Sequence, residues 1–141
     1  AGLLIHEGQV TYPALDLHKI VDLGEWWAHQ AAGLPLPLGG NGIRRDLGAP
    51  TIRRVAALLR QSIRYGLDHR PDALRHAMRY ARGVEPALVD RFVGMYVNDL
   101  TLGYGARGRA AVARLLRRGF EAGILPKDVV PEFAEGEEPA A

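Results

Sequence analysis

The chain has 141 residues, of which 48% are hydrophobic and 24% charged, and it contains no cysteine. That length suits one ordinary domain with its own core, and the lack of cysteine excludes disulfides, zinc–thiolate sites and cysteine nucleophiles. No apolar run approaches the roughly 18 residues of a membrane helix, and the opening residues lack the basic region of a signal peptide, so we expect a cytoplasmic protein with no membrane partner.

The net charge of +2 is unevenly distributed along the chain. Between Arg44 and Arg118 there are 16 arginines and 6 acids, whereas the segment from Lys127 onward has one base and five acids. Such an arginine-rich region is either a set of solvated helix faces or a surface for nucleic acid or another anionic partner. Aromatic residues are sparse in it, which counts against stacking on single strands.

The first third of the sequence predicts α/β structure. Residues 2–6, "GLLIH", form an apolar run without alternation, as in a buried strand of a parallel sheet, and residues 17–23, "LHKIVDL", predict a second strand. Asp22 is a good N-cap with Glu25 three residues later, so a helix is expected to follow and to end at Gly33. Two tryptophans are adjacent in this helix, and we expect one in the core and the other at an edge.

The segment "GLPLPLGGNGIRRDLG" (33–48) differs in composition from its surroundings. Its prolines favour an extended path, and its glycines permit backbone angles that other residues resist. We interpret it as a crossover or hinge between two packed regions, followed by a short strand near Ile43.

The rest of the chain predicts four helices, which follow Pro50, Pro71 and Pro86 and end at Gly123. We expect a loop over residues 98–108 and disorder over the acidic stretch "EFAEGEEPAA". The residues predicted to face inward are Ile52, Val55, Ala56, Leu59, Ile63, Leu67, Leu74, Ala77, Met78, Ala81, Leu88, Val89, Phe92, Val93, Tyr96, Val112, Leu115, Leu116 and Phe120.

Two or three strands do not make an ordinary sheet with both faces covered. We therefore expect further strands outside this sequence, with the chain being the C-terminal part of a longer protein or one half of a split one. The predicted organisation is part of an α/β lobe over residues 1–38, a crossover over 39–48, a helical region over 49–126 and an acidic tail over 127–141.

His6 is the candidate catalytic residue. Ligands of open α/β sheets bind beyond the carboxyl ends of strands, which is where His6 is predicted to lie, and an imidazole is a suitable base near neutral pH. The alternative is a histidine satisfied by hydrogen bonds at a strand end, with Glu7 either orienting the ring or pointing to solvent. Asn41 and Arg44 are candidate contacts for an anionic group of a substrate, although an Arg44–Asp46 surface pair is the stronger interpretation.

Four segments in this order resemble the C-terminal half of the 1,4-dihydroxy-6-naphthoate synthase family of menaquinone biosynthesis. They are "GLLIHEGQVTY" (2–12), "LHKIVDLGEWW" (17–27), "GLPLPLGGNGIRRDLG" (33–48) and "MYVNDLTLGYGARGRAAVARLLRRGFEAGILP" (95–126). Chorismate dehydratase, of the same pathway, is less similar at "IHEGQ" and "PLPLGGN".

The resemblance implies a two-lobed fold similar to type II periplasmic binding proteins, with a small-molecule substrate in the cleft. It implies a lyase of the futalosine pathway that cleaves cyclic de-hypoxanthine futalosine to 1,4-dihydroxy-6-naphthoate without metal or organic cofactor. The family's proton acceptor is the histidine of its "IHEG" motif, here His6. The main substrate-binding loops of the family lie upstream, so the missing N-terminal half is the expected partner. An arginine-rich nucleic-acid-binding module and a non-catalytic solute-binding relative are the alternatives.

Overall fold

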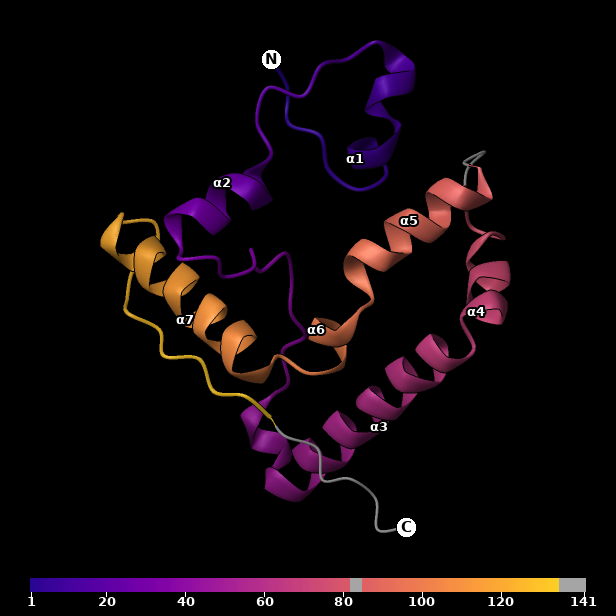
Figure 1. Cartoon of the computed structure of the whole chain (residues 1–141). Coiled ribbons are helices and arrows are strands. Elements are labelled where there is room, and N and C mark those ends of the chain that lie inside the picture. The colour runs from indigo at the N-terminus through magenta and orange to yellow at the C-terminus, as the bar shows by residue number, and fades with distance from the viewer. Residues whose placement is uncertain (82–84, 135–141) are drawn as a thin grey trace. The chain divides into compact units, whose positions relative to one another are not determined.

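A computed structural model describes residues 1–81 and 85–134 (Figure 1). Within those residues the regular elements are helices and no strand is formed. The elements are α1 (Gly8–Thr11), the 3₁₀-helix η1 (Tyr12–Leu15), α2 (Leu23–Gln30), the 3₁₀-helix η2 (Arg45–Leu47), α3 (Ala49–Asp68), α4 (Arg70–Ala77), α5 (Pro86–Tyr96), α6 (Asp99–Leu102) and α7 (Gly105–Glu121). No helix in the described part of the chain is long and apolar enough to cross a membrane.

The chain forms two compact units. The first unit comprises Ala1–Ile20 and Ser62–Leu102, and the second comprises Val21–Gln61 and Gly103–Ala141. Helix α3 therefore begins in the second unit and ends in the first. The predicted boundaries at residues 38, 48 and 126 concern the lobes of a larger fold and stay predictions.

In the first unit, helix α1 packs on helix α5. Val10 of α1 and Val89 of α5 are both buried, with 7% and 8% of their surface exposed. The side-chain amide of Gln9 donates a hydrogen bond of 2.8 Å to the hydroxyl of Tyr96, and the Tyr96 ring lies 5.0 Å from that of Phe92. These contacts fix a very short helix that could not be stable alone.

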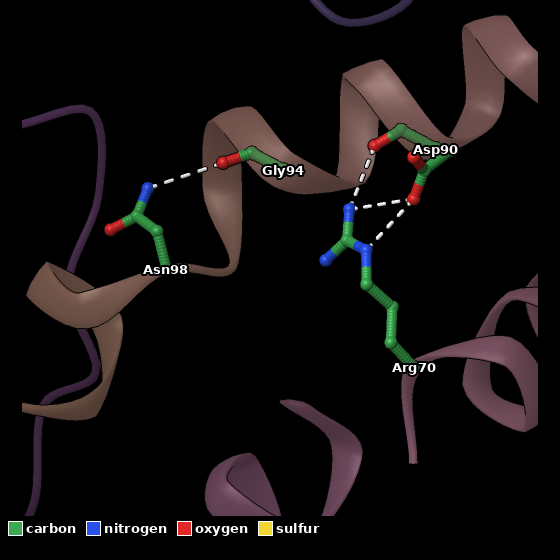
Figure 2. A network of polar contacts seen from close by, with 4 residues as sticks. All are labelled: Arg70, Asp90, Gly94 and Asn98. Carbon is green, nitrogen blue, oxygen red and sulfur yellow. Dashed lines mark hydrogen bonds and ion pairs between the residues drawn. The ribbon is translucent and has the colours of Figure 1, made fainter. Parts of the chain in front are cut away.

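A polar network then joins α5 to α4 and to α6 (Figure 2). The Arg70 guanidinium donates to the Asp90 carboxylate through Nε at 2.8 Å and to the Asp90 backbone carbonyl at 3.0 Å. At the other end of α5, the Asn98 side-chain amide donates to the Gly94 carbonyl at 3.3 Å, and its oxygen accepts from the Leu100 backbone N–H at 3.0 Å. Asn98 thus satisfies a free carbonyl at the end of α5 and caps the beginning of α6.

In the second unit, helix α2 has the N-cap that its sequence predicts, but it ends at Gln30, three residues before the predicted Gly33. The Asp22 carboxylate accepts hydrogen bonds from the backbone N–H groups of Gly24 and Glu25, at 2.9 and 3.1 Å. At the other end, the Gly33 N–H donates to the Ala28 carbonyl at 2.8 Å, and Ala32 and Gly33 take φ values of +54° and +75°. This is the bond that closes a Schellman motif.

The two tryptophans of α2 divide as expected. Trp27 is buried, with 4% of its surface exposed, whereas Trp26 is 48% exposed. The Trp27 indole N–H donates to the Pro35 carbonyl at 3.1 Å, and the Arg118 guanidinium lies 5.6 Å from its ring centroid. Ala31 and Ala111 are the other buried apolar residues of this unit among those described.

Helix α7 fastens the end of α2. Arg107 donates to the Gly33 carbonyl at 2.7 Å and Arg114 to the Gln30 carbonyl at 3.1 Å. The Gln30 carbonyl belongs to the last turn of α2, where carbonyls lack intrahelical partners and carry partial negative charge, so a cationic donor is favoured there. The Gly33 carbonyl lies just beyond the end of the helix. Part of the arginine excess is therefore structural.

Residues 2–6 and 17–23 and the region of Ile43 form no strand within the described residues. A strand exists only through hydrogen bonds to a second strand, and the partner strands are expected outside this sequence, so these strands stay predictions. The predicted loop over 98–108 is wrong, because it contains α6 and the start of α7. The helices after Pro50, Pro71 and Pro86 and the end near Gly123 are confirmed.

The inward-facing residues are only partly confirmed. Val89 is buried and most of the others are half-buried, but α3 contains no buried residue, and Val55 and Leu59 are 42% and 43% exposed. The helical period places these side chains on one face, but it does not specify an element that covers that face.

Candidate active site

His6 lies in a tight turn directly before α1. It is exposed and takes a φ of +52°, the left-handed region that few residues other than glycine adopt. The residues before His6 are irregular in this structure, and its predicted position at the tip of an interior strand stays a prediction. Asp16 and Ala32 occupy the same region, at φ values of +52° and +54°, and histidine is one of the residues that tolerate it.

Local hydrogen bonds maintain the turn. The His6 carbonyl accepts from the Gln9 N–H at 3.1 Å, and the Glu7 carbonyl accepts from the Val10 N–H at 3.0 Å. The Thr11 hydroxyl also donates to the Glu7 carbonyl at 3.0 Å. The segment from His6 to Thr11 is thus a single wound unit with the imidazole at its start.

Contacts distant in sequence hold this unit in place. Gln9 and Tyr96 are 87 residues apart, and their side-chain hydrogen bond ties α1 to α5. Helix α5 is in turn held by Arg70 through Asp90 (Figure 2). The roles of Gln9 and Arg70 were not predictable from the sequence, because each contact joins separate helices and no local pattern signals it.

Glu7 does not orient the imidazole. Both side chains belong to the described part of the chain, both are exposed, and no hydrogen bond joins them. The alternative in which Glu7 faces solvent is the one that the structure favours.

Arg44 forms the predicted surface pair. Its Nε donates to one oxygen of Asp46 at 2.9 Å and its terminal nitrogen to the other at 2.5 Å, a two-point arrangement. The two side chains are 79% and 64% exposed. The hydrogen bond from Arg44 lowers the pKa of the Asp46 carboxyl below its ordinary value. Asn41 is exposed, three residues before this pair.

His6 belongs to the first unit, whereas Asn41 and Arg44 belong to the second. The predicted site residues thus fall into two groups, one in each unit. No cluster of three or more histidine, aspartate or glutamate side chains that could hold a metal ion is found in residues 1–81 and 85–134. A surface hollow lined by Gln30, Arg114, Arg117, Arg118 and Glu121 contains none of the predicted site residues.

Acidification is expected to release Glu132 from Arg45, with which it forms an ion pair. The hydrogen bond and the charge of Arg45 lower the pKa of the Glu132 carboxyl below its ordinary 4.5. Because the folded pKa is the lower one, the contact is fully stabilising above pH 4.5 and is lost as the pH falls through the lowered pKa. In an NMR titration, Arg45→Gln should raise the Glu132 midpoint, and the control Arg44→Gln should not. An unchanged midpoint in Arg45→Gln would contradict the pairing.

Comparison with known proteins identifies the family. The profile of a family described as menaquinone biosynthesis matches residues 1–121, which is most of the chain. The chain belongs to this menaquinone biosynthesis family.

Two curated proteins are similar to this chain. A 1,4-dihydroxy-6-naphthoate synthase from Streptomyces coelicolor is 44% identical over 127 residues, which cover 89% of this chain and 44% of that protein. A synthase of the same name from Thermus thermophilus is 40% identical over 133 residues, covering 94% and 48%. The resemblance predicted from the four sequence segments is confirmed.

A solved structure is also similar. The crystal structure of a protein from Archaeoglobus fulgidus is 38% identical and superposes with a TM-score of 0.81, over 86% of this chain and 46% of that one. The chain thus spans just under half the length of these relatives.

Proposed function

We propose that this chain is the C-terminal half of a 1,4-dihydroxy-6-naphthoate synthase, a lyase of the futalosine route to menaquinone. The observation that carries the proposal is the 44% identity to the Streptomyces coelicolor synthase over 89% of the chain. The match to the family profile, which covers residues 1–121 and includes the His6 turn, supports it.

The complete protein is proposed to have two lobes, as in type II periplasmic binding proteins, with the substrate between them. The similarity to the Archaeoglobus fulgidus structure over 46% of its length supports a larger fold of which this chain is one part. The strands missing from the described residues would be formed with the remainder of the protein, as α/β architecture requires.

The proposed reaction is the cleavage of cyclic de-hypoxanthine futalosine to 1,4-dihydroxy-6-naphthoate by elimination. A base removes a proton beside the bond that breaks, and His6 is assigned this role. Its exposure leaves the imidazole accessible, and its φ of +52° is held by a turn that α5 fixes in place. Asn41 and Arg44 stay candidate contacts for an anionic group of the substrate, and in the described structure Arg44 donates to Asp46. The proposal requires no metal and no organic cofactor.

The alternative of a nucleic-acid-binding module has less support. Arg107 and Arg114 donate to carbonyls at the end of α2, and Arg70 is used by Asp90. Arginines occupied in this way contribute less to a free phosphate-binding surface. The absence of a nucleic-acid partner stays a prediction.

The test uses a chimera in which all 141 residues of this chain replace the region that they match in the Streptomyces coelicolor synthase. We expect the chimera to form the naphthoate product from cyclic de-hypoxanthine futalosine and the chain alone to form none, because the cleft is incomplete. Product formation by the chain alone would contradict the half-site proposal. Tight binding by the chimera without product would indicate a non-catalytic solute-binding relative.

A further inference from the structure

The chain after α7 returns along that helix (Figure 1). The reversal follows a Schellman motif, in which the Ile124 N–H donates to the Gly119 carbonyl and the Gly123 N–H to the Phe120 carbonyl, each at 2.9 Å, with Gly123 at a φ of +72°. We call the described residues 125–134 the tail strap. Asp128 fixes its first part to α7 by accepting a hydrogen bond of 2.5 Å from Arg117.

The far end of the tail strap is fixed by two adjacent residues. Phe133 is half-buried, its ring packs edge-on against Tyr104 at 5.4 Å, and the Arg109 guanidinium lies 5.3 Å from its centroid. Glu132 forms an ion pair and a hydrogen bond with Arg45. An aromatic contact and a charged contact thus act side by side.

The contacts of Phe133 and Glu132 connect the tail strap to residues 40–45, the segment that contains Asn41 and Arg44. The Tyr104 hydroxyl lies 3.3 Å from the position that a Cβ on Gly40 would occupy, so Phe133 supports a ring whose end lies against Gly40. Gly40 directly precedes Asn41, and Arg45 directly follows Arg44. The tail strap therefore contacts the chain on both sides of the two candidate substrate-binding residues, once through Tyr104 and once directly.

We propose that Glu132 and Phe133 are positioning residues, which order residues 40–45 so that Asn41 and Arg44 can meet an anionic substrate. This rests on the proposed function in so far as those two residues contact substrate. A glycine-rich segment has many accessible conformations, and a ligand that must order it loses affinity. Contacts that order the segment beforehand strengthen substrate binding without taking part in the proton transfer.

The first measurement uses the complete 141-residue chain and makes no use of activity. Amide exchange and NMR relaxation at Gly40, Asn41 and Arg44 should show faster exchange and greater mobility in Phe133→Ala and Glu132→Gln. Phe133→Tyr keeps the ring and should behave like the unaltered chain. The matched control is Val130→Ala, because Val130 lies in the same strap and is 80% exposed. Unchanged exchange in both test variants would overturn the proposal.

The second measurement uses the chimera. Phe133→Ala should raise KM about tenfold, the loss expected when a preordered segment must be ordered by the ligand, with kcat within about twofold because the base is untouched. Phe133→Tyr should restore KM. An equal fall in kcat with KM unchanged would overturn the positioning role.

The two measurements distinguish failure of the positioning proposal from failure of the proposed function. Faster exchange with an unchanged KM, in a chimera that turns over, would overturn substrate positioning and leave the proposed function standing. A chimera without turnover would refute the proposed function and, with it, the substrate part of this proposal.

Discussion

Replacing Trp27 by alanine is expected to destabilise the second unit by about 3–5 kcal/mol, the usual cost of removing a buried tryptophan side chain. Trp27 is 4% exposed, the lowest exposure of any large side chain among the described apolar residues. Its removal leaves a cavity beside α2 and also removes the hydrogen bond to the Pro35 carbonyl and the ring beneath Arg118. Urea unfolding followed by far-UV circular dichroism measures the loss.

The neighbouring tryptophan provides the matched control for this measurement. Trp26 has the same side chain on the same helix but is 48% exposed, so Trp26→Ala should cost less than about 1 kcal/mol. Trp27→Phe keeps most of the apolar surface and loses the indole N–H, so its cost should fall between the two alanine variants. A larger loss for Trp26→Ala than for Trp27→Ala would show that the core of this unit lies elsewhere.

Features decided by a few neighbouring residues were predictable from the sequence. Asp22 caps α2 as expected, because its carboxylate needs only the N–H groups of the next turn. Gly123 ends α7 as expected, because only glycine takes a positive φ there without strain. The division of Trp26 from Trp27 follows from the width of an apolar helix face.

Features decided by distant residues were not predictable in the same way. The apolar run at residues 2–6 indicates burial, but strand formation depends on a partner strand that local sequence does not specify. The hydrogen bond between Gln9 and Tyr96 joins residues 87 positions apart, and so does the one between Arg45 and Glu132. A single sequence carries no signal for such pairs, so the elements that hold the His6 turn and the tail strap became visible only in the structure.

The candidate site was predictable in part. The resemblance to the family predicted His6 as the catalytic residue. In the structure His6 is exposed and lies in a turn with a φ of +52°. The Arg44–Asp46 pair was predictable from spacing, because two exposed residues of opposite charge at positions i and i+2 can meet in solvent. The hydrogen bonds from Arg107 and Arg114 to the Gly33 and Gln30 carbonyls were not predictable, because they depend on how α7 lies against α2.

His6→Asn in the chimera is expected to lower kcat by about 10²–10⁴-fold, the contribution typical of a positioned general base. Asparagine is the informative replacement because it tolerates the left-handed backbone conformation that His6 adopts at a φ of +52°. It therefore removes the basic nitrogen and leaves the turn intact. The unfolding midpoint should be unchanged, and substrate KM should change far less than kcat if the imidazole acts mainly in the transition state.

A second exposed histidine separates loss of the base from a general effect of histidine replacement. His18→Asn makes the same chemical change at an exposed residue, for which no role in the reaction is assigned, and it should leave turnover unchanged. His6→Ala should lower turnover at least as much as His6→Asn does. It should also lower the free energy of unfolding, because alanine is less tolerant of the left-handed region than asparagine. If His6→Asn retains full turnover, the proton is removed by another group.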